Sequence, residues 1–259
     1  MTVPHPGSWN VPPSGVFPEV QIPLEFLPPS KQAGPMNFIC APAWCRLASA
    51  LLGAIAFNLS AQPGLAPTQK LELFDGKSFS GWTFVSRDTN APAHAIWSVT
   101  NGIIVCQGKP YGYARTTQWY HDYRLHAEWR WPDGPGNSGV FLHIQPPDKV
   151  WPLCFEAQLL AGNAGELRLN GGSHIAGLDA HARSVPRQHP SSEKPAGEWN
   201  DYDIVCRSNS ISIRVNGLLQ NDVAGTSVAS GAIGLQAEGQ LVEFRNIFLE
   251  PLPADQPAK

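Results

Sequence analysis

The chain has 259 residues, of which 42% are hydrophobic and 15% charged, a composition typical of a globular protein with a sizeable core. Its formal net charge of −3 and isoelectric point near 6.2 leave no excess of positive charge to neutralise phosphates, which argues against a nucleic-acid partner. The length suits one large β domain.

The first 61 residues differ in character from the rest. Residues 1–35 contain nine prolines and no sustained apolar period, which predicts a disordered or extended extension, or a wrongly assigned start if Met36 begins the protein. Within 36–61, a short apolar run with small residues at its exit resembles a secretory signal peptide. The run is short for a membrane span, although a weak anchor is the alternative. We expect an exported protein, periplasmic or secreted, without a stable membrane span in its mature form.

Three cysteines follow this leader, Cys106, Cys154 and Cys206, each in an apolar, strand-like run. An odd number allows at most one disulfide, and the spacing matches no zinc pattern. We expect buried free thiols. The sequence identifies no cofactor and leaves a divalent cation open.

Beyond a linker at 62–70, signals of β structure recur to the C-terminus. Short runs rich in Val, Ile, Phe and Trp alternate with Gly, Asn, Asp and Pro, and no segment sustains a helical period over three turns. Asn216-Gly217 predicts a tight hairpin, since both residues tolerate a positive φ. The pattern predicts an all-β sandwich over 71–252, with long loops at 132–137 and 178–198 and a tail at 253–259.

Polar side chains occur in the middle of two predicted strands. Because a strand alternates its side chains between two faces, Glu128 and Arg130 lie on the same face of their strand. Glu156 and Gln158 likewise lie on the same face of theirs. A carboxylate within an apolar run costs free energy unless it is paired or functional. Such rows predict a sheet that holds a polar ligand, although Glu128 and Arg130 also fit a structural ion pair on the surface.

Several short motifs occur in order over nearly the whole predicted domain: Leu73–Trp82, Ile96–Gly102, Asn137–Phe141, Phe155–Gln158, Lys194–Asn200 and Gly231–Gln236. Their ordered combination resembles the 3-keto-disaccharide hydrolase domain family. The resemblance implies a concanavalin A-like jelly roll of two antiparallel sheets with a concave face toward carbohydrate, in agreement with the β pattern. It also implies a small carbohydrate substrate.

The chemistry implied by this resemblance is elimination from a 3-keto-glycoside. A ketone at C3 acidifies the C2 proton, a base removes it, the C1 substituent leaves, and water adds to the product. This needs a base active near neutral pH and groups that stabilise the enolate. Glu156 and His143 are the candidate bases, although a lone His is more often structural. The candidate substrate-binding residues are Glu128, Arg130, Asn137, Trp151, Gln158, His174 and Gln236.

Strand parity predicts that the polar candidates of neighbouring strands project into one cleft, with loop residues at its rim. On this view Glu128, Arg130, His143, Glu156 and Gln158 line the cleft, and Trp151 and His174 lie on its loops. The chain departs from the family pattern at His143, where Arg is frequent, and at Ala237-Glu238-Gly239, where Asp-His-Gly is frequent. A non-catalytic sugar-binding module is therefore the alternative function, and a structural envelope domain a weaker one.

Overall fold

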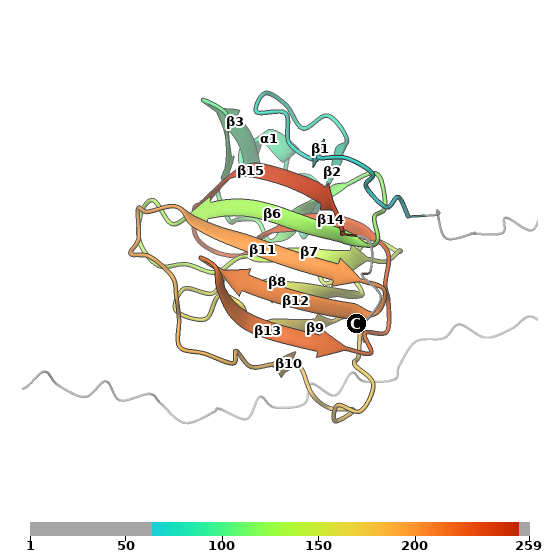
Figure 1. The fold of residues 1–259 in the computed structure, drawn as a ribbon. Helices are drawn as coiled ribbons and strands as arrows, with labels where there is room; N and C mark the ends of the chain where they lie inside the picture. Colours follow the sequence, from blue (N-terminus) through green and yellow to red (C-terminus); the bar gives the residue numbers. More distant parts are fainter. Residues whose placement is uncertain (1–63, 254–259) are drawn as a thin grey trace, which may run out of the picture. The chain divides into compact units, whose positions relative to one another are not determined.

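A computed structural model describes residues 64–253, so the predicted N-terminal extension and signal peptide lie outside the described residues. The described part consists almost entirely of strands, with one short helix, α1 (Ala93–Ile96). The strands form two antiparallel sheets stacked face to face (Figure 1), which confirms the predicted all-β sandwich. No helix of this part is long and apolar enough to cross a membrane.

The first sheet, called sheet 1, has eight strands. They are β1 (Leu71–Glu72), β3 (Trp97–Thr100), β4 (Ile103–Cys106), β6 (Tyr123–Arg130), β11 (Asn200–Arg207), β12 (Ser210–Val215), β13 (Leu218–Ala224) and β15 (Val242–Pro251). Their order is β13-β12-β11-β6-β15-β4-β3, and β1 pairs with β15. In Figure 1 the strands from β15 to β13 form the front layer.

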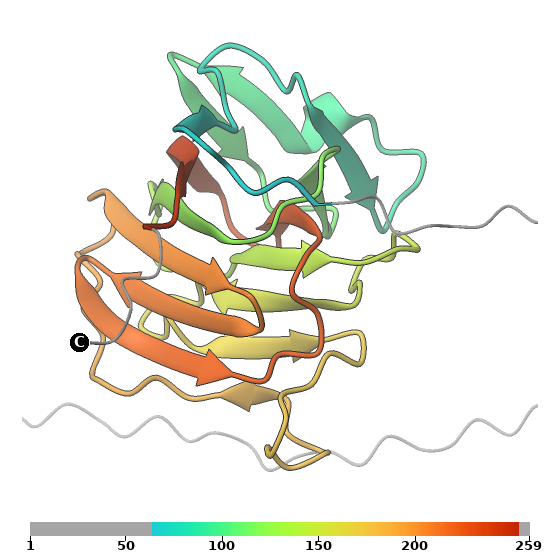
Figure 2. The ribbon, with the colours of Figure 1, turned by 45° about the vertical axis from the view of Figure 1, so that its right-hand side comes forward.

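The second sheet, called sheet 2, has seven strands. They are β2 (Trp82–Ser86), β5 (Gly112–Thr116), β7 (Gly139–Ile144), β8 (Cys154–Gln158), β9 (Leu167–Asn170), β10 (Ser184–Val185) and β14 (Ala232–Ala237). Their order is β10-β9-β8-β7-β14-β5-β2. Figure 2, turned by 45°, shows the yellow-green strands of sheet 2 as a separate layer to the right of the orange strands β11, β12 and β13.

The core lies between the two sheets and follows the period of two in each strand. Along β6 every second residue is buried, and Trp129 packs against Tyr202 of β11 with ring centroids 4.7 Å apart. Cys106, Cys154 and Cys206 are buried and unbonded, which confirms the prediction of free thiols. The predicted hairpin is also confirmed, because Asn216 and Gly217 join β12 to β13 with φ angles of 48° and 81°.

Two irregularities interrupt the alternation. The pairing of β14 with β7 shifts register next to His143, whose φ is 58°, and the pairing of β15 with β6 shifts next to Asn246, whose φ is 50°. A bulge adds one residue to one strand, so side chains beyond it exchange faces. The first of these bulges decides where one of the predicted catalytic residues lies.

Candidate functional site on the outer face of sheet 2

A row of polar residues crosses the face of sheet 2 that points away from sheet 1, called the outer face. Tyr113 of β5 pairs with Gln236 of β14. On the other side of β14, the register with β7 places Gln236 next to Gly139. Gly139 in turn pairs with Gln158 of β8. Because directly paired residues point to the same side of a sheet, these side chains share one surface. Four strands, β5, β7, β8 and β14, therefore contribute to one site.

Glu156 lies at the centre of the neighbouring row, between Phe141 of β7 and Arg168 of β9. Its neighbours on the strand, Phe155 and Ala157, belong to the core between the sheets, so Glu156 points to the outer face as parity predicts. Only 2% of Glu156 is exposed.

The carboxyl group of Glu156 has a single hydrogen bond in this setting. Asn170 donates from Nδ2 to Oε2 over 2.6 Å, whereas Oε1 has no partner among the described residues. Burial raises the pKa of Glu156 from its ordinary value of 4.5 to about 7; the hydrogen bond from Asn170 opposes this rise, and the charge of Glu238 adds to it. Glu156 is therefore a carboxyl group that titrates near neutral pH.

Glu238 is a second carboxyl group of the site, and strand periodicity in the sequence does not indicate it. It follows β14 directly and accepts a hydrogen bond of 2.9 Å from Nδ2 of Asn137, and Gln236 also donates to it. Burial raises the pKa of Glu238, while Arg168 and the two amides oppose the rise. Since Glu238 also raises the pKa of Glu156, the two carboxyl groups interact through their charges.

Buried oxygen atoms without partners gather around this pair. Oε1 of Glu156, Oε1 of Gln236 and Oδ1 of Asn137 are buried and accept no hydrogen bond from any described residue. Buried polar groups are normally paired, so three unpaired acceptors close together make this part of sheet 2 unusual.

An aromatic pair stands beside Glu238. Trp151, on the connection between β7 and β8, is 41% exposed and meets Tyr111 edge to face, with ring centroids 6.2 Å apart. Tyr111 precedes Gly112, whose partner across the sheet is Ala237, the residue before Glu238. The aromatic pair and the second carboxyl group therefore lie at the same end of β5 and β14.

Asp148 fixes the connection that carries Trp151. Its carboxylate accepts hydrogen bonds from Nε and Nη2 of Arg115, at 2.8 and 2.7 Å, and from the hydroxyl of Tyr113 at 3.0 Å. Both partners are outer-face residues of β5. The side-chain bonds of Arg115 hold the pKa of Asp148 below its ordinary value, so it stays charged. The connection is thus anchored over the sheet.

The prediction that His143 shares the face of Glu156 is wrong. His143 is fully buried and packs against Tyr123 of sheet 1, with ring centroids 5.8 Å apart, and its Nδ1 lies 3.2 Å from the carbonyl oxygen of Val228. The bulge at His143 reverses parity and turns the imidazole into the core. Burial lowers its pKa to about 4. A base in this position is separated from the outer face by the sheet itself.

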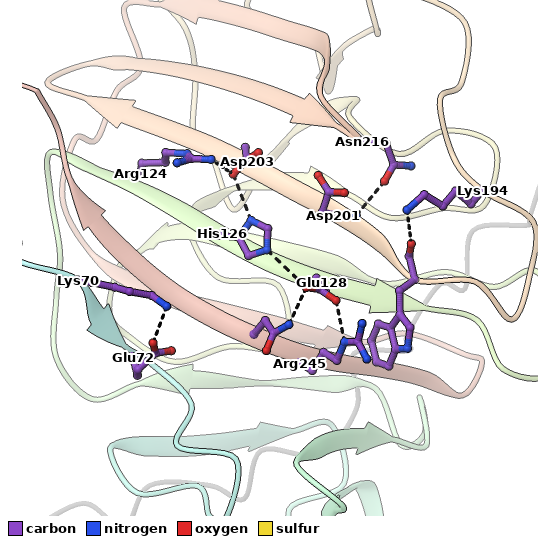
Figure 3. Close-up of polar contacts among 12 residues, drawn as sticks. Lys70, Glu72, Arg124, His126, Glu128, Lys194, Asp201, Asp203, Asn216 and Arg245 are labelled. Atoms are coloured by element: carbon purple, nitrogen blue, oxygen red, sulfur yellow. Dashed lines mark hydrogen bonds and ion pairs between the residues drawn. The ribbon is translucent and has the colours of Figure 1, made fainter.

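The prediction that Glu128 and Arg130 line the same cleft is also wrong, because β6 belongs to sheet 1. Glu128 accepts hydrogen bonds from Nε of Arg245 at 2.7 Å and from Asn246 at 2.6 Å, on the side of sheet 1 away from the core (Figure 3). Burial favours a raised pKa for Glu128, but these bonds outweigh it and lower the pKa. Arg130 pairs with Glu243. Both residues form structural ion pairs, the alternative that their pattern left open.

The other candidates divide between the site and its surroundings. Gln158 lies on the outer face, but its Oε1 accepts the backbone N–H of Leu160 at 2.9 Å. Asn137 and Gln236 both contact Glu238. His174 is exposed on the loop after β9, where its backbone N–H donates to Ser227. Within residues 64–253, no group of three His, Cys, Asp or Glu side chains is arranged to hold a metal ion.

Comparison with known proteins identifies the family. Residues 70–250 match the model of the 3-keto-alpha-glucoside-1,2-lyase-like domain. The chain belongs to this family. The resemblance noted in the sequence is thereby confirmed, and the chain is a glycosyl hydrolase-like, carbohydrate-active domain. No curated protein matches the chain.

Solved structures agree with the family on the fold. A candidate glycosyl hydrolase from Parabacteroides distasonis superimposes with a TM-score of 0.54 at 20% identity, covering 71% of this chain and 94% of its own. A beta-glucanase from Bacillus licheniformis superimposes with a TM-score of 0.52 at 16% identity, covering 74% of this chain and 100% of its own. At these identities the likeness concerns the jelly-roll fold alone.

Proposed function

We propose that this domain cleaves 3-keto-glycosides, with Glu156 as the base that removes the C2 proton. The observation that supports it best is the buried carboxyl of Glu156, with one unpartnered oxygen and a pKa raised to about 7, in a polar face built from several strands. A general base is most effective when its pKa lies near the working pH. An exposed carboxylate, with a pKa near 4, would be a much weaker base.

The elimination proceeds in two steps, and hydration follows. The carboxylate of Glu156 takes the proton from C2, and the electrons of that C–H bond form an enolate with C3. The enolate then restores the C3 ketone, a double bond forms between C1 and C2, and the bond from C1 to the glycosidic oxygen breaks. The leaving oxygen takes up the proton held by Glu156, and water adds afterwards to the unsaturated sugar.

Arg168 is the residue we assign to the developing negative charge. It pairs with Glu156 across β8 and β9, and it lowers the pKa of both Glu156 and Glu238, so its guanidinium lies near both carboxyl groups. A fixed positive charge beside an enolate is a strong source of transition-state stabilisation. Glu238, held by Asn137 and Gln236, would accept hydrogen bonds from sugar hydroxyl groups.

A non-catalytic sugar-binding domain is the second candidate, and the exposed Trp151, which packs on the half-buried Tyr111, favours it. Aromatic platforms serve sugar-binding modules as well as enzymes, and the fold does not distinguish the two. In this alternative the raised pKa of Glu156 would be a consequence of burial without a catalytic role.

The two candidates are separated by incubating the protein with 3-keto-glucosides and with their unoxidised parents in D2O. The enzyme should release the C1 substituent from the 3-keto compounds alone and exchange their C2 proton for deuterium. Binding of both kinds of sugar without release or exchange would establish the binding module instead. Glu156→Gln should lose both reactions, whereas Glu128→Gln, a carboxyl group of the other sheet, should keep them.

A further inference from the structure

The side chain of Asn170 binds one oxygen of Glu156 and leaves the other without a partner. Its Nδ2 donates to Oε2 of Glu156 over 2.6 Å and lies 4.0 Å from Sγ of Cys154. The opposite orientation of the amide would place its oxygen against the carboxylate, where two acceptors repel each other. Oε1 of Glu156 accepts no hydrogen bond from any described residue. The two oxygens of this carboxyl group are therefore not equivalent.

The two oxygens also lie toward different neighbouring strands. Oε2 meets Asn170 at the end of β9, whereas Oε1 lies in front of Gly139 of β7, where an added Cβ atom would be 2.4 Å from it. β7 and β9 are the two neighbours of β8 in sheet 2. Asn137, just before β7, and Gln236, on β14 beyond it, carry the other unpartnered oxygens of the site. Oε1 is thus on the same side of β8 as these acceptors.

A tight turn after β9 fixes Asn170 in this place. The backbone N–H of Ser173 donates to the carbonyl oxygen of Asn170 at 3.0 Å, and the two glycines between them have φ angles of 60° and 95°. A Cβ atom on Gly171 would lie 2.4 Å from the backbone nitrogen of Leu153, so the turn packs against the start of β8. Oγ of Ser173 also donates to the carbonyl oxygen of Cys154 at 2.8 Å. The turn is therefore attached to the strand that carries the carboxyl group.

We propose that Asn170 is a positioning residue, which binds Oε2 of Glu156 and makes Oε1 the oxygen that removes the C2 proton. The inference rests on the proposed function, which it deepens by assigning the reacting atom, and it places C2 on the β7 side of the carboxyl group. Burial raises the pKa of Glu156, and the hydrogen bond from Asn170 opposes that rise. The other charges that act on Glu156 belong to Glu238, Arg168 and Glu166, and the variants below leave them in place.

Two substitutions separate this positioning role from simple packing. Asn170→Leu keeps the approximate size of the side chain and removes the donor. Asn170→Asp keeps its shape and places a second carboxyl group against Glu156; the Asp, at a half-buried position, ionises first. We expect the midpoint of kcat/KM against pH to move upward by about one unit in Asn170→Leu and further in Asn170→Asp. A packing role predicts the opposite order of damage and an unchanged midpoint, and that result would overturn the proposal.

Ser173→Ala is the matched control, because it removes a bond between the same turn and β8 without touching Glu156. It should lower the melting temperature and leave the midpoint in place, and a shift as large as that of Asn170→Leu would contradict the proposal. If the wild type cleaves no 3-keto-glycoside, the proposed function fails, and an NMR titration of the Glu156 carboxyl carbon replaces the rate profile. Midpoints in the same order, with the wild type lowest, would then support Asn170 as the residue that sets the ionisation of Glu156. Equal midpoints would overturn it.

Discussion

Oε1 of Glu156 occupies the space in front of Gly139 on the neighbouring strand, where a Cβ atom at position 139 would lie 2.4 Å from it and 2.7 Å from Cγ. Gly139 does not adopt a positive φ, so the backbone alone does not require a glycine here. The absence of a side chain instead makes room for the carboxyl group. The Asn-Ser-Gly motif therefore positions Glu156 as well as starting β7.

Gly139→Ala should move the carboxyl of Glu156 and lower turnover, with a stability cost of about 1–3 kcal/mol from overpacking. The same substitution in a Glu156→Ala background should cost less, because the overlapping atoms are gone. Urea unfolding of the four proteins gives the coupling free energy, and kinetics of the single variant give the loss of turnover. Equal stability costs in the two backgrounds would contradict the contact.

The pKa of Glu156 predicts how the rate depends on pH. If Glu156 acts as the base, kcat/KM rises as the pH passes through about 7, where the carboxyl of the free enzyme ionises. Loss of a general base costs about 10²–10⁴-fold in rate, and Glu156→Gln should show a loss of this size. A rate that instead falls above pH 7 would assign Glu156 the role of proton donor.

The raised pKa of Glu156 also predicts how the free energy of unfolding changes with pH. The folded protein holds a proton on Glu156 up to about pH 7, whereas the unfolded chain releases it near pH 4.5. The free energy of unfolding therefore falls as the pH rises from about 4.5 to about 7, and Glu156→Gln lacks this loss. Chemical denaturation at several pH values should show the variant gaining relative to the wild type across this window, whereas Glu128→Gln should show no such gain.

Glu238→Gln should shift the pH profile. The charge of Glu238 is one cause of the raised pKa of Glu156, so its removal should move the midpoint of the rate profile to lower pH. KM should rise as well, since an amide is a weaker acceptor for sugar hydroxyls than a carboxylate. Glu72→Gln, at the edge of sheet 1, is the matched control and should leave the midpoint in place. An unchanged midpoint in Glu238→Gln would show that the two carboxyl groups act independently.

The sequence predicted the sandwich and the direction of Glu156, because both follow from the period of two within a single strand. It could not assign Glu128 and Glu156 to different sheets, since parity orders the faces of one strand and says nothing of its neighbours. Glu238 was missed as a site residue because it lies just after a strand, outside any alternating run. Its only signal was a departure from the family pattern, where His is frequent.

His143 shows the remaining limit of strand parity. A single bulge reverses the faces of a strand, and the residue that adopts the positive φ is an ordinary His, without the Gly or Asn that would signal such a turn. Nothing in the local sequence distinguishes an inward from an outward imidazole here. The contact with Tyr123 of the opposite sheet settles its direction, and so a variant at this position tests the assignment of the base.

His143→Asn should keep turnover within a few-fold of the wild type, because the imidazole lies in the core and Asn tolerates the positive φ at this position. The variant should also change the response of stability to acid. The folded protein keeps His143 neutral down to about pH 4, whereas the unfolded chain takes up a proton near pH 6.5, so the free energy of unfolding of the wild type falls as the pH drops through this window. Asn does not titrate. Between pH 7 and pH 4.5, chemical denaturation should therefore show a larger loss of stability in the wild type than in the variant. A large loss of turnover by the variant at neutral pH, with the fold intact, would instead make His143 a catalytic candidate again.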